Sequence, residues 1–169
     1  MTPSLLRIYT AEVVGTFLLV LFGTGSVAAA VVTGAQVGVW QVAVVWGFGV
    51  TLAIYATAAI SGAHLTPAVS LAMAVFRPDE FPRQRLLPYW GAQLIGAIIA
   101  GFVILAVFGS FIDRFEETHN LVRGEAGSQA SAMVFGEYFP NPAVFGTDAA
   151  AFELVSPLAA AAVEAFGTG

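Results

Sequence analysis

The fold is decided by one stretch of the sequence, residues 61–76, which read SGAHLTPAVSLAMAVF. The stretch follows a long apolar run, and no charged residue appears until Arg77. It is too apolar for a solvated loop and too short to cross a bilayer, as expected of a re-entrant segment. Thr66 and Pro67 match a helix N-cap followed by proline at the first helical position. The sequence therefore predicts a loop that dips into a membrane and continues as a half-helix.

The composition supports a membrane protein. Of the 169 residues, 58% are hydrophobic and 10% are charged, whereas soluble domains carry about a quarter charged residues. Three stretches are long and apolar enough to span as helices, at about 11–32, 39–60 and 86–109. The first could also be a secretory signal peptide, but Glu12 at its start and its span-like length favour a retained helix. We therefore expect an all-α membrane protein.

Charge and residue types exclude several functions. The formal charge is −5 and lysine is absent, so the chain offers little to nucleic-acid phosphates. Without cysteine there is no disulfide, thiolate nucleophile or sulfur metal ligand. Neither His64 nor His119 has the partners that acyl transfer needs, and we expect His64 to bond neighbouring backbone rather than a metal. The sequence predicts no enzyme activity, no cofactor, no metal site and no nucleic-acid partner.

The placement of arginines predicts the orientation. Arg7 precedes the first span, and three arginines lie within residues 77–85, between the second and third spans. Because cytoplasmic loops carry the excess of basic residues, we expect the N-terminus and this loop on the cytoplasmic side of a plasma or inner membrane. The acidic stretch 110–157 is expected to be an extracellular or periplasmic loop, and residues 158–169 to be the start of a truncated fourth span.

The dipping segment has specific electrostatics. The half-helix would point its positive dipole end and unpaired N–H groups at the bilayer middle, where cations and protons would be repelled. The non-helical backbone from Gly62 to Leu65 must be buried in protein or line a water-filled path. Its carbonyls could then replace the hydration of a hydroxyl-bearing solute. The alternative is an amphipathic helix lying at the cytoplasmic interface.

A short pattern repeats at the two ends of the chain. Glu12 is followed by Gly15-Thr16, and Glu164 is followed in the same spacing by Gly167-Thr168. Each copy lies near the start of a span. Because an odd number of spans separates them, the second copy would have the opposite orientation in the membrane, as in inverted-repeat membrane proteins. We expect Glu12 and Glu164 to accept hydrogen bonds from dipping loops and to hold loop carbonyls toward a pore. A proton relay is the alternative role.

These residues resemble the major intrinsic proteins, or aquaporins. The segment 61–69 is similar to the family's first Asn-Pro-Ala loop, with Thr66 in the place of the asparagine. Ala11-Glu12 with Gly15-Thr16 and the segment WGFGV at 46–50 are also similar. The resemblance covers the chain as the family's N-terminal half and implies an aquaporin-like inverted-repeat bundle. It implies a first repeat over 1–109 and, for the full-length protein, homotetramers with one pore per subunit.

The resemblance is closer to the glycerol facilitators. Trp46 matches the aromatic of their narrow selectivity region, and the stretches 115–124 and 138–142 are similar to their outer loop. The signature Asn141-Pro142-Ala143 also occurs, but in the acidic outer region, where we expect a turn. The resemblance implies a passive channel for glycerol and other small uncharged solutes, with water.

The resemblance also implies the pore residues. They are Trp46 and the seven residues of the loop and helix start, Gly62, Ala63, His64, Leu65, Thr66, Pro67 and Ala68. Thr66 would offer a rotatable hydroxyl where asparagine offers an amide. Three alternatives stay open: a water-selective aquaporin, a truncated fragment without its own transport activity, and a coupled secondary transporter.

Overall fold

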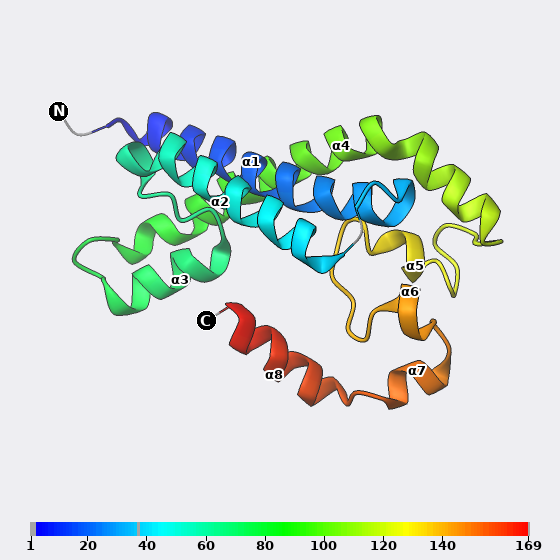
Figure 1. The fold of residues 1–169 in the computed structure, drawn as a ribbon. Helices are drawn as coiled ribbons and strands as arrows, with labels where there is room; N and C mark the ends of the chain where they lie inside the picture. The colour runs from blue at the N-terminus through cyan, green and yellow to red at the C-terminus, as the bar shows by residue number, and fades with distance from the viewer. Residues whose placement is uncertain (1–2, 37, 169) are drawn as a thin grey trace.

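The structure, a computed structural model, describes residues 3–36 and 38–168, and within these ranges every regular element is helical (Figure 1). Three long helices are apolar enough to cross a membrane: α1 (Leu5–Thr33), α2 (Val39–Ser61) and α4 (Leu86–Thr118). The shorter α3 (Pro67–Phe76) follows α2, and the 3-10 turn η1 (Arg83–Arg85) leads into α4. The expected all-α fold with three spans is confirmed.

Two of the long helices extend beyond their predicted ends. Helix α1 begins at Leu5 rather than near Ala11, because the Ser4 side chain caps it by accepting from Arg7 N at 3.4 Å. Helix α4 continues past Gly109 to Thr118, so the outer segment begins as helix and not as loop. It stops before Asn120, whose φ of 54° is the left-handed conformation that ends many helices.

Helix α1 packs against both α2 and α4, and glycines allow the close approach. A Cβ added at Gly96 on α4 would lie 3.0 Å from Phe17 N and closer still to Val13 O, both backbone atoms of α1. A Cβ at Gly49 on α2 would collide with the Phe22 side chain. Small residues at such crossings let helix backbones approach where lipid supplies no hydrophobic drive. The helix crossings therefore depend on these two glycines.

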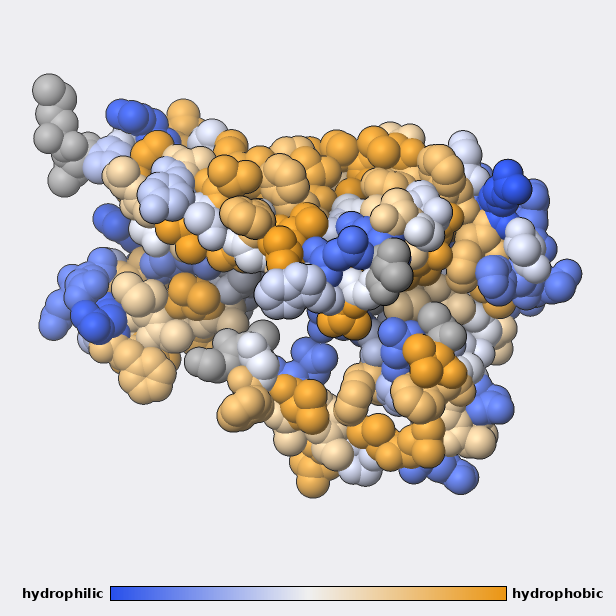
Figure 2. All heavy atoms as spheres, viewed as in Figure 1, coloured by the Kyte–Doolittle hydropathy of each residue, from blue (hydrophilic) through white to orange (hydrophobic). Residues whose placement is uncertain are grey.

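The outer face of the long helices is apolar. Leu94, Ile98 and Phe102 on α4 are 61%, 49% and 68% exposed. Figure 2 shows apolar residues gathered over the long helices, with many of the hydrophilic residues toward the two ends of these helices. A soluble monomer rarely exposes so much continuous apolar surface. The pattern matches a helical protein whose middle belt faces lipid.

The segment after α4 contains three short helices and one longer one. They are α5 (Gln129–Ala132), α6 (Pro142–Phe145), α7 (Ala149–Glu153) and α8 (Pro157–Thr168). The stretch expected as a loop over 110–157 is thus partly helical. Asn141-Pro142-Ala143, expected as a turn, leads into the single helical turn of α6. Helix α8 lies apart from α1 and α4 in the ribbon view (Figure 1).

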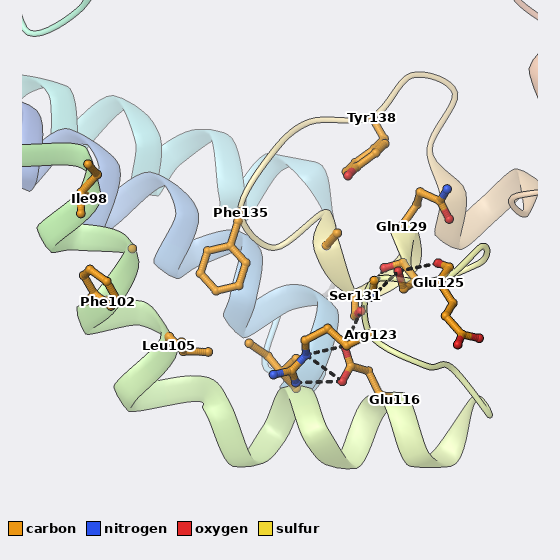
Figure 3. A pocket seen from close by; sticks show the side chains of 15 residues that line it. Ile98, Phe102, Leu105, Glu116, Arg123, Glu125, Gln129, Ser131, Phe135 and Tyr138 are labelled. Atoms are coloured by element: carbon orange, nitrogen blue, oxygen red, sulfur yellow. Dashed lines mark hydrogen bonds and ion pairs between the residues drawn. The ribbon is translucent and has the colours of Figure 1, made fainter. Parts of the chain in front are cut away.

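An ion-pair cluster fastens this outer segment to α4 (Figure 3). Arg123 Nη2 lies 2.6 Å from Asp113 Oδ1 and 2.8 Å from Glu116 Oε2, and Ser131 Oγ donates to Glu116 Oε1 at 2.7 Å. The hydrogen bonds to Glu116 and Asp113 raise the pKa of Arg123 above its ordinary value. A cavity of about 680 Å³ lies beside the cluster, and Phe102 and Phe135 are among the residues that line it.

Replacing Gly96 by alanine tests the α1–α4 crossing. The added methyl would meet α1 backbone atoms, which cannot rotate away, so we expect a loss of ~1–3 kcal/mol in the free energy of unfolding. The matched control is Gly101→Ala on the same helix, where a Cβ meets nothing within 4 Å. Thermal midpoints of the full-length protein in detergent would measure both. Equal midpoints for the two variants would contradict this account of the crossing.

Candidate pore site

The site lies where α2 ends and α3 begins. Helix α2 stops at Gly62, which has a φ of 87°, and residues 62–66 are non-helical. Thr66 caps α3, because its side chain accepts from Val69 N at 3.3 Å, and Pro67 occupies the first turn. Trp90 on α4 donates from Nε1 to Pro67 O at 3.1 Å. The N-terminus of α3 is therefore fixed at the end of a short non-helical loop.

This loop has a strained backbone. Ala63 and Leu65 have φ values of 50° and 61°, in the left-handed region that side chains other than glycine disfavour. Such a conformation costs ~1–2 kcal/mol per residue and persists only when the surroundings impose it. Something outside the loop must therefore hold it in place.

The carboxylate of Glu12 holds the loop from α1. Its Oε1 accepts from His64 N at 3.0 Å and from Ser61 Oγ at 2.6 Å. Its Oε2 accepts from Leu65 N at 2.9 Å and from Gln93 Nε2 at 2.9 Å. Glu12 is 0% exposed, and a carboxylate buried to that degree is tolerated only when such donors satisfy it. Four donors, two of them loop amides, thus converge on one side chain.

A second set of polar side chains from α4 and α3 supports the carboxylate. Gln93 Nε2 also donates to Ser70 Oγ at 2.9 Å, and that hydroxyl lies 3.2 Å from His64 Nδ1. Tyr89 donates from its hydroxyl to Ser61 O at 2.7 Å. Sequence reasoning missed Gln93 and Tyr89. The signal that could have found them is their spacing of four residues, which places two polar groups on one face of an apolar helix.

The four loop carbonyls differ in their partners. His64 O accepts from Thr66 N at 2.7 Å, and Leu65 O accepts from Thr16 Oγ1 at 2.8 Å. The carbonyls of Gly62 and Ala63 accept no hydrogen bond from any residue that the structure describes. Gly62 is also exposed and Ala63 half-buried, whereas His64 and Leu65 are buried. Two carbonyls thus have no partner among the described residues, and two have one partner each.

The remaining site residues lie close to this loop. Thr66 is half-buried, and Pro67 and Ala68 are exposed at the start of α3. The His64 ring, buried, packs against Phe81 and Tyr89 with ring centroids 4.5 Å and 4.9 Å away. The hydrogen-bond partner of the ring is therefore the Ser70 hydroxyl, and not neighbouring backbone as expected from the sequence.

Trp46 joins the loop through an apolar cluster. It packs against the cluster of Leu19, Ala53 and Leu65, so the tryptophan and the loop share one set of contacts. It also borders a cavity of about 830 Å³ between α1, α2 and the outer segment, with Thr24 among the other lining residues. Figure 2, viewed as Figure 1, shows an opening directly above α8.

Glu164 lies elsewhere. It is exposed on α8 and borders the same 830 Å³ cavity as Trp46. The structure does not bring it to the loop over 62–66, whose amides at His64 and Leu65 bond to Glu12 instead. Its expected role toward a second dipping loop stays a prediction.

The fold and the site define a helical membrane protein in which a half-helix starts at a carboxylate-held loop. A family model described as the major intrinsic protein matches residues 1–163. The chain belongs to the major intrinsic protein family.

Known relatives agree with this assignment. The chain is 46% identical over 144 residues to a glycerol uptake facilitator protein of Pseudomonas aeruginosa, covering 85% of this chain and 50% of the relative. It is 40% identical over 155 residues to a propanediol uptake facilitator of Salmonella typhimurium, covering 92% of this chain and 58% of the relative. The chain thus spans about half the length of the curated relatives it matches.

A solved structure shares the fold. The aquaglyceroporin from Plasmodium falciparum superposes with a TM-score of 0.60 at 31% sequence identity, covering 66% of this chain and 45% of that one. The aquaporin-like helical fold expected from the sequence is therefore confirmed.

Substitution of Glu12 by glutamine tests the carboxylate's role. An amide has one oxygen, so two of the four donors would face an NH₂ group. At about 1–3 kcal/mol for each unmatched buried donor, we expect a loss of ~2–6 kcal/mol of stability. The matched control is Glu80→Gln, which breaks the exposed Arg77–Glu80 pair at 2.8 Å and should cost ~0–1 kcal/mol.

The measurement for both variants is the thermal midpoint of the full-length protein in detergent. A Glu12→Gln protein that melts at the native temperature would show that the carboxylate does not hold the loop.

Proposed function

We propose that the full-length protein is a passive channel for glycerol and other small uncharged solutes, with water. The observation that carries the proposal is the Glu12-held loop, which leaves the carbonyls of Gly62 and Ala63 without partners beside the N-terminus of α3. The names of the relatives, a glycerol uptake facilitator and a propanediol uptake facilitator, support a small polyol as the permeant.

The proposed mechanism needs only hydrogen bonds and a dipole. A polyol hydroxyl would donate to the Gly62 and Ala63 carbonyls in place of water, so the solute would lose little hydration free energy. The aligned peptide dipoles of α3 give its N-terminus a partial positive charge, which disfavours cations and protons. No covalent step and no cofactor is required.

Two side chains would shape selectivity. The Trp46 ring would form an apolar wall along which the carbon backbone of a polyol could slide. Thr66 Oγ1 already accepts from Val69 N, which leaves the hydroxyl proton free to donate to a solute oxygen. Thr66 can therefore cap the helix and serve as the donor that the family's asparagine amide supplies. Pro67 and Ala68 would complete the helix start at the pore wall.

The membrane arrangement follows from the same reasoning. We infer that the N-terminus and the loop over 77–85 face the cytoplasm, because these regions hold four of the six arginines. The first repeat would cover 1–109, the outer segment 110–157, and the second repeat would begin at 158–169. Glu164 would be the counterpart of Glu12 in that second repeat. The protein would lie in the cell membrane as a homotetramer.

Flux measurements on the full-length protein in liposomes test the proposal. We expect glycerol efflux that is insensitive to ionophores and membrane potential, because Glu12 already bonds four donors and is poorly placed to couple a proton. The Thr66→Asn variant should also conduct glycerol, with a changed ratio of glycerol to water permeability. Native protein without glycerol flux, with flux restored by asparagine, would contradict the role given to Thr66. Flux driven by a proton gradient would instead support a coupled transporter.

A further inference from the structure

A glycine on α1 lies directly against the Trp46 ring. A Cβ added at Gly23 would come well under 3.0 Å from three atoms of that ring, Cη2, Cζ2 and Cε2. Gly23 is buried in the middle of α1, where a helical backbone does not require glycine. The absence of a side chain at Gly23 therefore makes space for the Trp46 ring, and the backbone conformation does not require a glycine there.

The ring has no free space on the side of Gly23. A Cβ at Gly23 would meet the ring there, and the ring also packs against the cluster of Leu19, Ala53 and Leu65. Its open side is the 830 Å³ cavity, which it borders together with Thr24 of the next position on α1. Ordinary carbon–carbon contacts lie at about 3.5–4.0 Å, so a methyl at Gly23 would displace the ring by about 1 Å. The direction left for that displacement is the cavity.

We propose that Gly23 is a specificity-determining residue that acts by positioning the Trp46 ring. This inference rests on the proposed channel function. The depth of the ring against α1 sets the width of the passage that Trp46 borders, and a solute with a carbon backbone needs more width than water. A side chain at Gly23 therefore narrows the passage selectively against glycerol without touching the solute itself.

The chain offers a matched control on α2. Gly47 is adjacent to Trp46 in sequence, and a Cβ there meets nothing within 4 Å. Gly47→Ala thus adds the same methyl beside the same tryptophan without contacting the ring. Any general effect of replacing a glycine in these helices would appear in both variants.

The test measures glycerol and water permeabilities of the full-length protein in liposomes by stopped-flow light scattering. We expect Gly23→Ala to lower the ratio of glycerol to water permeability about tenfold, a factor that corresponds to ~1.4 kcal/mol of added barrier. Gly47→Ala should keep the native ratio. Combining Gly23→Ala with Trp46→Phe should return the ratio to that of Trp46→Phe alone, because the smaller ring lacks the atoms that the methyl would meet.

The outcomes separate this inference from the proposed function. Native protein that conducts no glycerol overturns both. Native protein that conducts glycerol, with a Gly23→Ala variant of unchanged ratio, overturns only the role of Gly23. A Gly23→Ala variant that loses both permeabilities equally, and is not rescued by Trp46→Phe, would show that the glycine serves helix packing alone and would also overturn the inference.

Discussion

A carboxylate that is fully buried in a membrane helix needs hydrogen-bond donors around it. The donors that bond to Glu12 all belong to the candidate pore site. Two are amides of the strained loop, at His64 and Leu65, and the others are the side chains of Ser61 and Gln93. The same hydrogen bonds therefore offset two costs, the burial of the Glu12 charge and the left-handed backbone at Ala63 and Leu65. Without the carboxylate the loop amides would lose their acceptor, and without the loop the charge would lose half its donors.

The rest of the fold brings α1 close enough for this contact. Glycines at the crossings allow α1 to lie against both α2 and α4, so that Glu12 reaches the loop and Gln93 at the same time. The same closeness positions the Trp46 ring, because that ring lies against α1 at Gly23. The contacts of the loop and the position of the ring are thus two consequences of how tightly α1 is packed.

Local features of the site could be predicted from the sequence, and its distant contacts could not. Thr66-Pro67 indicated the start of α3, because capping depends on neighbouring residues alone. The repeated Glu-x-x-Gly-Thr pattern pointed to Glu12 as support for the loop. Gln93 was missed because its role depends on which face of α4 meets α1, and the end of α4 was misplaced because Arg123 stabilises it through Glu116 from outside the helix.

The most direct test of the account is an experimental structure of the full-length protein with glycerol bound. We predict glycerol hydroxyls within hydrogen-bond distance of the Gly62 and Ala63 carbonyls, while the Glu12 carboxylate accepts from His64 N and Leu65 N. A structure in which Glu12 bonds other groups, and glycerol lies away from both carbonyls, would contradict it.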